Sequence, residues 1–200
     1  MNVFEDYKAI LKTGTEQLTF KEKPLEFSLM DFWQWSVSDI LSNATRGRFA
    51  EFINATAVNV DIKTIRDEWG AFDLETPNGI KIEVKSSAYL QTWYQKALSK
   101  ISFSTKAAFT LDVATNKYSE LASRSADVYV FCLLHHENKK TVDPLNLDQW
   151  EFYVMSTTEL NNYTRSQYSI TLASLKKLTN AVSYDKLSEA IEGKNKLNNL

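Results

Sequence analysis

Asp73, Glu83 and Lys85 have the side-chain types and the spacing for chemistry at a metal ion. The segment 76–79, Thr-Pro-Asn-Gly, lies between the two acids and has the residues of a three-residue β-hairpin loop. Its proline suits the first central position of a type I turn, and its glycine suits the left-handed position that follows. In that register Asp73 faces Glu83, and Lys85 follows two residues later on the same face of the hairpin.

This register places two like charges opposite each other, which destabilises a sheet. The neighbouring pair, Glu75 opposite Lys81, is by contrast a favourable cross-strand ion pair. A divalent cation between Asp73 and Glu83 explains why two acids are placed opposite each other, because carboxylate oxygens are ligands that suit Mg²⁺ or Mn²⁺. The alternative is a solvated strand face on which a lysine bridges two acids.

A helix expected over 46–58, with Thr45 as its cap, carries a third acid beside its apolar stripe. This residue, Glu51, is by itself a solvated surface glutamate. Arg46 and Arg48 lie near the N-terminal end of the same helix. They are candidates for contacts with phosphate groups.

Residues 84–111 contain lysines and aromatic residues but no acid. Lys96 and Lys100 are therefore candidates for phosphate contacts, and the interleaved aromatic rings for base stacking. Gln91 is a candidate to contact a phosphate group, or a water molecule that attacks it. The alternative for Gln91 is a plain surface role. The whole stretch is equally consistent with an ordinary loop whose aromatic rings pack on the core.

Bulk properties indicate one folded domain of 200 residues with a net charge of −2. With so little net charge, any binding of nucleic acid must come from a local patch. Cys132, the only cysteine, lies in an apolar run and is expected to be a buried thiol. No apolar run approaches the roughly 20 residues of a membrane span, and none resembles a signal peptide, so we expect a cytoplasmic protein without membrane contact.

The pattern of apolar residues predicts the elements that position these side chains. Helices are expected over 4–13, 29–41, 46–58, 119–125, 174–178 and 184–191, and strands over 70–75, 80–89, 127–134, 150–155 and 168–172. Ser28 is the expected cap of helix 29–41, whose apolar stripe we expect on the core. The order of elements predicts an α/β fold with a central mixed sheet and helices on both faces.

Asp73, nine intervening residues and then Glu83-Val84-Lys85 resemble the signature of the PD-(D/E)xK nucleases, the restriction-endonuclease-like superfamily. The resemblance implies a three-layer core over about 28–175, in a single domain 1–200 with a C-terminal helical extension over about 176–200. Phe72 stands where the family often has proline, a position that varies among its members.

The resemblance also implies roles for the candidate residues. Asp73 and Glu83 would bind Mg²⁺, with Mn²⁺ as a possible substitute, and Glu51 would be a further ligand. Lys85 would assist the attacking water or stabilise charge. The implied activity is hydrolysis of phosphodiester bonds, with DNA as the expected substrate. The alternative is a non-catalytic module on the same fold that binds a partner protein or nucleic acid. A chain this short leaves little room for a recognition domain, so specificity would need a homodimer, a partner protein or the structure of the nucleic acid itself.

Overall fold

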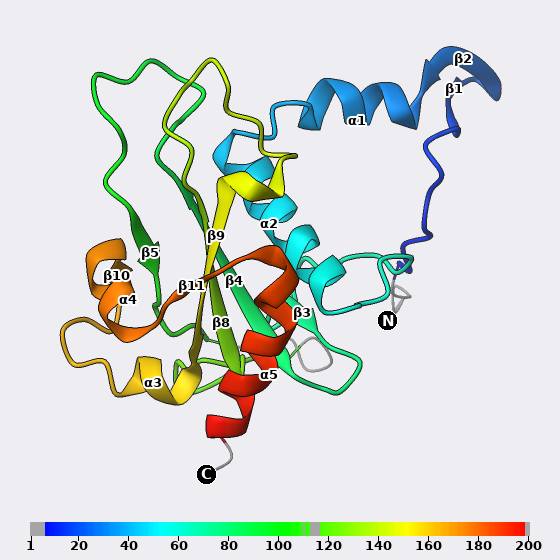
Figure 1. Cartoon of the computed structure of the whole chain (residues 1–200). Helices are drawn as coiled ribbons and strands as arrows, with labels where there is room; N and C mark the ends of the chain where they lie inside the picture. Colours follow the sequence, from blue (N-terminus) through cyan, green and yellow to red (C-terminus); the bar gives the residue numbers. More distant parts are fainter. Residues whose placement is uncertain (1–6, 110, 113–116, 199–200) are drawn as a thin grey trace.

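The computed structural model describes residues 7–109, 111–112 and 117–198. Its centre is a five-stranded mixed sheet in the order β11-β9-β8-β4-β3 (Figure 1). The strands are β3 (Leu74–Glu75), β4 (Lys81–Ala88), β8 (Val128–Leu134), β9 (Trp150–Ser156) and β11 (Ala181–Val182). β4 and β8 run parallel, and the other neighbours are antiparallel. The predicted α/β fold with a central mixed sheet is confirmed.

The sequence of each central strand explains its place in the sheet. All seven residues of β8 are buried, as its near-continuous apolar run predicts for a strand covered on both faces. In β4 apolar and charged residues alternate, so that Ile82 and Val84 point to one side and Glu83 and Lys85 to the other. The charged face of β4 lies next to aromatic residues of β8, because Glu83 pairs with Tyr129 in the parallel register.

Helices cover both faces of the sheet, which gives three layers (Figure 1). α2 (Asn43–Ala57) and α5 (Leu187–Asn198) pack on the face that includes Ile82 and Val84. The opposite face packs on α3 (Thr157–Asn161), α4 (Leu172–Leu178) and the two-stranded sheet of β5 (Ser102–Ser104) and β10 (Ser169–Thr171).

The remaining elements lie outside these three layers. They are β1 (Gln17–Phe20), β2 (Lys23–Ser28), α1 (Leu29–Val37), β6 (Leu111–Asp112), β7 (Lys117–Tyr118) and the 3-10 turns Leu147–Gln149 and Tyr184–Lys186. In the region 176–200, where we expected a helical extension, β11 joins the sheet and α5 packs on it. None of the helices in the described residues is long and apolar enough to cross a membrane.

The prediction that helix 29–41 packs on the core is wrong. The helix ends at Val37, and none of its residues is buried. The Ser28 cap forms as predicted, since its hydroxyl accepts a hydrogen bond from the Asp31 N–H (3.3 Å) and the Asp31 carboxylate accepts one from the Ser28 N–H (2.6 Å). With β1 and β2, α1 forms a projection from the body of the molecule, residues 14–37, which we call the arm (Figure 1).

Several predicted boundaries also differ from the structure. α2 begins at Asn43 with Ser42 as its N-cap, three residues before the predicted start, so Thr45 lies inside the helix and is not its cap. The expected strand 70–75 is regular only over Leu74–Glu75. Residues 119–125 form no helix, and neither do residues 7–13; the start of the expected helix 4–13 lies outside the described residues.

Candidate active site

The hairpin that carries the candidate residues has the predicted register. Leu74 pairs with Ile82, and the Thr76 N–H donates to the Ile80 carbonyl oxygen (2.9 Å). Gly79 adopts the left-handed conformation, with φ of 81°. Asp73 immediately precedes β3, and its N–H donates to the Ile82 carbonyl oxygen (3.0 Å). The hairpin therefore brings Asp73 alongside the charged face of β4.

The Asp73 carboxyl is where the charges of the candidate set act together. Its Oδ2 accepts a hydrogen bond from the Val84 N–H (2.7 Å). Burial, with the negative charges of Glu83 and Glu51, raises the pKa of Asp73 to about 6, although the Val84 N–H and the Lys85 ammonium act to lower it. Asp73 is thus a proton-binding carboxyl surrounded by the other three charges that the sequence singled out.

Glu83 and Lys85 form an ion pair on the face of β4 opposite to Ile82 and Val84. The Glu83 side chain is 21% exposed and the Lys85 side chain is 30% exposed, so solvent reaches this ion pair. Tyr129 lies beside Glu83 on the neighbouring strand, where burial and the Glu83 charge raise the pKa of its phenol to about 12. The phenol therefore stays neutral, and it forms one wall of the site.

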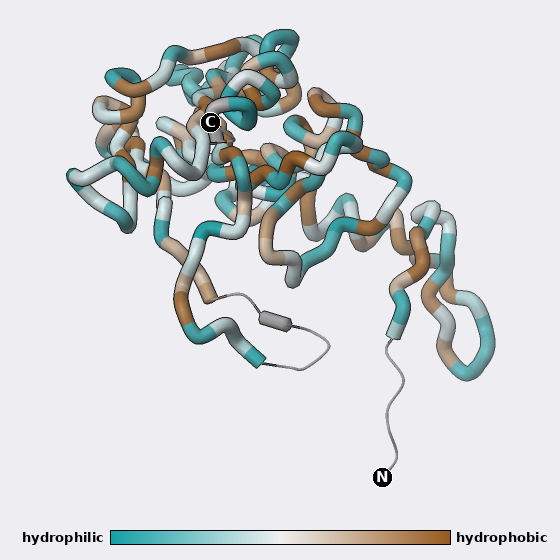
Figure 2. Tube along the Cα trace, turned by 90° about the horizontal axis from the view of Figure 1, so that it is seen from below, coloured by the Kyte–Doolittle hydropathy of each residue, from teal (hydrophilic) through white to brown (hydrophobic). Residues whose placement is uncertain are grey.

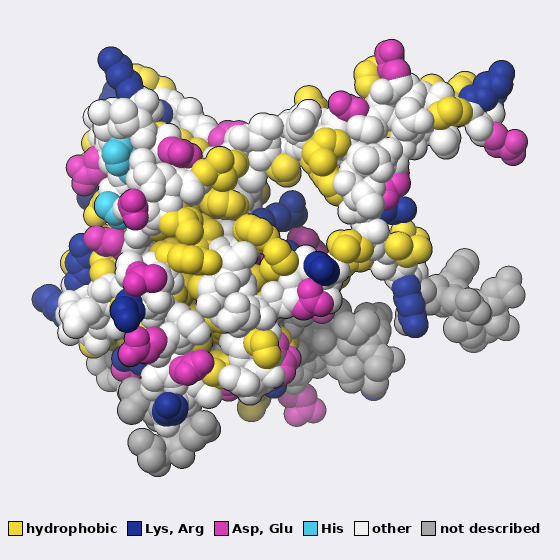
Figure 3. All heavy atoms as spheres, turned by 45° about the vertical axis from the view of Figure 1, so that its right-hand side comes forward, with side chains coloured by type: hydrophobic (Ala, Val, Ile, Leu, Met, Phe, Trp, Pro, Cys, Tyr) yellow, Lys and Arg dark blue, Asp and Glu magenta, His cyan; other side chains and the backbone are white. Residues whose placement is uncertain are grey.

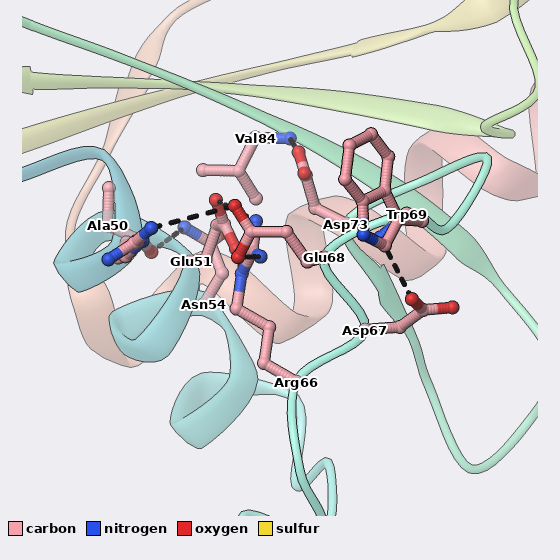
Figure 4. A network of polar contacts seen from close by, with 10 residues as sticks. Ala50, Glu51, Asn54, Arg66, Asp67, Glu68, Trp69, Asp73 and Val84 are labelled. Carbon is pink, nitrogen blue, oxygen red and sulfur yellow. Dashed lines mark hydrogen bonds and ion pairs between the residues drawn. The ribbon is translucent and has the colours of Figure 1, made fainter. Parts of the chain in front are cut away.

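Glu51 reaches the same region from α2 and is held by an arginine that the sequence analysis missed (Figure 4). Both carboxylate oxygens of Glu51 accept hydrogen bonds from the Arg66 guanidinium, Oε1 at 3.1 Å from Nη2 and Oε2 from Nε. Arg66 also pairs with Glu68 (3.0 Å). The pairing with Glu51 raises the pKa of Arg66. No motif marks Arg66; the charged run Arg66-Asp67-Glu68 shortly before Asp73 is the one sequence signal that points to it.

The carboxylates lie where two clefts meet. A cleft of about 430 Å³ is lined by apolar side chains, by two arginines and by five acids: Arg48, Arg66, Glu51, Asp61, Asp67, Asp73 and Glu75. A second cleft, of about 340 Å³, is lined by Asp73, Glu83, Lys106, Trp69, Phe109, Tyr118 and Tyr129. Because Asp73 borders both clefts, an extended ligand that follows them passes over this carboxyl.

Exposed aromatic rings in the second cleft were also missed by the sequence analysis. Trp69, Phe109 and Tyr118 are all more than half exposed. Trp69 and Phe109 lie in irregular segments and Tyr118 ends β7, so only the fold brings these rings to one cleft. Flat exposed rings beside a lysine are the features that stack and hold nucleobases and phosphates.

The predicted phosphate contacts of the α2 arginines have different outcomes. Arg48 is exposed and lines the first cleft, with its Nη2 3.5 Å from a carboxylate oxygen of Glu68. Arg46 is buried, 3% exposed, and its guanidinium donates to Leu41 O (2.8 Å), Asn43 Oδ1 (2.6 Å) and Ser86 Oγ (3.3 Å). We therefore withdraw Arg46 as a phosphate contact: it joins α2 to β4 inside the protein.

The candidates for phosphate contact that follow β4 in the sequence lie past its C-terminal end, and the hairpin turn is at the other end of the strand. Gln91 is buried, and its amide nitrogen donates to Ala88 O (3.0 Å) and Ser99 Oγ (3.3 Å), which corrects the predicted contact with water or phosphate. Lys96 and Lys100 are exposed on the irregular segment that follows, as a phosphate contact requires. The structure does not bring them to either cleft beside Asp73.

The residue types fit a divalent cation, but the side chains are arranged around protein cations. Among the described residues, no three His, Cys, Asp or Glu side chains form a ready-made metal cluster. Glu51 turns to Arg66 and Glu83 turns to Lys85, while Asp73 accepts from a backbone N–H. Three acids from α2, the start of the hairpin and β4 nevertheless lie close enough together that the charges of Glu83 and Glu51 act on the Asp73 carboxyl.

Comparison with known protein families gives a match to the family described as bacteriophage T4 endonuclease IV, over residues 25–173. The match includes Glu51, Asp73, Glu83 and Lys85 and covers well over half of the chain. No curated protein sequence matches the chain. This chain belongs to the bacteriophage T4 endonuclease IV family, and the family supports its assignment as a nuclease.

Proposed function

We propose that this family member is a metal-dependent nuclease that hydrolyses phosphodiester bonds in DNA at a site of the PD-(D/E)xK type. Membership of an endonuclease family supports the activity. The observation that carries the choice of site is the convergence of Glu51, Glu83 and Lys85 on the partly buried Asp73 carboxyl. A carboxyl with a raised pKa in a cleft, beside other charges, is typical of functional sites.

Asp73, Glu83 and Glu51 would hold Mg²⁺ or Mn²⁺. Such an ion supplies a Lewis acid for a phosphate oxygen and lowers the pKa of bound water. The site contains three acids against the cations Lys85 and Arg66, so an excess of negative charge is left to attract it. The mutual repulsion that raises the pKa of Asp73 is relieved when a positive ion joins the acids.

Lys85 and Arg66 act on the phosphate in this proposal. When Glu83 turns from Lys85, the ammonium is free to orient the attacking water or to neutralise charge on the phosphate oxygens. When Glu51 turns from Arg66, the planar guanidinium presents paired N–H groups, which match two phosphate oxygens. In this proposal each cation leaves a protein carboxylate and binds phosphate oxygens of the substrate instead.

The two clefts give the substrate its path. Arg48 in the first cleft and Lys106 in the second are cations available to phosphate groups on either side of Asp73. Trp69 and Tyr118 supply exposed rings on which bases stack. Local contacts of this kind suit a chain whose net charge is only −2.

Calorimetric titration with Mn²⁺ tests the metal site without relying on activity. The wild type should bind Mn²⁺, and Glu83→Ala should lose at least about tenfold in affinity, as removal of a carboxylate ligand predicts. Glu137→Ala is the control, because Glu137 is exposed after β8 and lines neither cleft, so this variant should bind as the wild type does. Equal affinity in all three proteins would rule out a metal site at Glu83.

Plasmid cleavage by lysine variants tests the catalytic role. Lys85→Ala should lose activity by about two to three orders of magnitude, as loss of a charge-stabilising group predicts. Lys81→Ala, on the same face of β4, should retain activity.

The pairing of Glu51 and Glu83 with protein cations also suits a non-catalytic binding module on this fold. That module would bind DNA or a protein but neither bind Mn²⁺ nor cleave, and this combination of results would replace our proposal.

A further inference from the structure

The arm, residues 14–37, is folded as a unit. β1 and β2 pair with each other and with no other described strand. The chain before the hairpin returns to α1, since the Met30 N–H donates to Gly14 O (2.9 Å) and the Leu29 N–H to Glu16 O (2.8 Å). Gly14, with φ of 92°, lies directly under Trp33, where an added Cβ would approach a ring carbon to 2.9 Å. The arm is therefore an ordered element and not a loose tail.

The arm has no core of its own and projects from the body (Figures 1 and 3). Described residues 15–37 include no buried side chain. Large apolar side chains are instead exposed along it: Leu18, Phe20, Leu25, Phe27, Met30, Phe32, Trp35 and Val37. Figure 2 shows these apolar stretches on a segment that is separate from the main body. A lone two-stranded hairpin and a nine-residue helix are each marginal in water, so this surface calls for a partner.

The charges of the arm select the kind of partner. Residues 14–37 contain four acids and two lysines, Lys21 and Lys23. This excess of acids disfavours nucleic acid and anionic membranes as the covering surface. On α1 the only charge is Asp31, which is engaged by the Ser28 cap. The face that presents Phe32 and Trp35 is thus uncharged, and two copies of it meet without like-charge repulsion.

The exposed area is sufficient for a pair of arms. Phe20, Phe27 and Phe32 are between half and two thirds exposed, and Trp35 is 84% exposed. At about 150–250 Å² for each aromatic side chain, the four rings expose roughly 500 Å². Leu18 and Leu25 bring the area to roughly 600 Å², whereas Met30 and Val37 lie on the other side of α1 from Phe32 and Trp35 and are not counted. Specific interfaces begin at about 600 Å² on each partner, so two arms that cover each other reach the size of a small specific contact.

We propose that the arm is the dimerisation element of this chain, and that the arm of a second copy covers its apolar face in a two-fold symmetric contact. The same patch then serves both partners, as a symmetric dimer requires. The exposed Trp35 ring lies on α1 at the centre of the contact and is its main anchor, since tryptophan is the residue type most enriched among binding hot spots. This inference is independent of the proposed metal site.

Sedimentation velocity of the whole chain tests the proposal at roughly 1 to 100 µM. The wild type should sediment as a dimer of about 46 kDa, twice the 22.9 kDa of one chain. Trp35→Ser should weaken the dimer by at least about 25-fold, as loss of a hot-spot tryptophan predicts. Trp69→Ser is the matched control: this ring is 77% exposed but lies on the body, and the variant should dimerise as the wild type does.

Circular dichroism of each variant establishes that it folds. If Trp35→Ser does not fold, Phe32→Ser takes its place, because Phe32 lies on the same helix and is 51% exposed. A wild-type monomer throughout the concentration range would overturn the proposal and leave the arm to a different protein. An unchanged dimer in a folded arm variant would also overturn it and place the interface elsewhere. Neither result depends on nuclease activity, so failure of the active-site proposal remains distinguishable.

Discussion

Replacing Asp73 with Asn should stabilise the metal-free protein at neutral pH. Burial and the nearby Glu83 raise the pKa of Asp73 to about 6 in the folded protein, against an ordinary value of 3.8. The folded state therefore holds this proton more tightly than the unfolded state does. Its contribution to stability is fully present below about pH 3.8 and is lost as the pH rises through about 6. Asn keeps the shape of the side chain and an oxygen for the Val84 N–H.

The magnitude follows from the two pKa values. Their difference corresponds to about 3 kcal/mol between the charged and neutral forms. Asn, which is never charged, should thus raise the free energy of unfolding by about 3 kcal/mol at pH 7.5 but by only about 0.5 kcal/mol at pH 4. The metal-binding function that we propose for Asp73 would then be maintained at the expense of stability, as is common for active-site residues.

Urea unfolding in the presence of a chelator measures this difference. Wild type and Asp73→Asn are compared at pH 4 and pH 7.5, with Glu75→Gln as a control at an exposed position of the same hairpin. The control should change the free energy of unfolding by less than about 0.5 kcal/mol at either pH. No gain for Asp73→Asn at pH 7.5, or an equal gain at both pH values, would refute the assignment of a raised pKa to Asp73.

Four further predictions follow from the same contacts. Because a proton on Asp73 competes with the metal, the calorimetric affinity of the wild type for Mn²⁺ should rise about tenfold from pH 5 to pH 7 and then level off; a flat profile would contradict this. Arg66→Met should bind Mn²⁺ several-fold more tightly, since Glu51 loses its competing partner, and weaker binding in the same titration would show that the pair does not compete. Cys132 is fully buried with its pKa raised by that burial, so a thiol reagent should react in urea but not with the native protein; rapid native labelling would argue against its position in β8. Ile82→Ala should lower the free energy of unfolding in urea by about 2–5 kcal/mol, because Ile82 of β4 is fully buried in the core on the side that α2 covers. A decrease of less than about 1 kcal/mol would contradict that packing.

Local patterns in the sequence were sufficient to predict the hairpin and the buried strand. The turn residues Pro77 and Gly79 set the register, and the strict alternation of Ile82, Glu83 and Val84 set which face carries the acids. The apolar run of β8 predicted a strand covered on both sides. Each of these depends on geometry within a few residues, which is why the sequence alone was enough.

Burial decided by distant contacts was not predictable in the same way. Helical periodicity shows that α1 has an apolar face, but the same pattern results whether its own core or a second copy covers that face. The sequence around Arg46 predicts a surface charge, and only the fold shows that Ser86, 40 residues away, lies beside its guanidinium. Arg66 lies in an irregular segment without periodicity, so only the fold reveals its pairing with Glu51.

Cleavage of DNA by Asp73→Asn tests the central claim most directly. Supercoiled plasmid and single-stranded DNA are incubated with wild type, Asp73→Asn or Glu137→Gln, in Mg²⁺, Mn²⁺ or chelator; Glu137 is exposed and lines neither cleft. We predict that wild type and Glu137→Gln cleave only when a metal is present, and that Asp73→Asn, although folded and more stable, does not cleave. Full activity in Asp73→Asn, or cleavage by the wild type in chelator, would contradict the proposed site and its metal dependence.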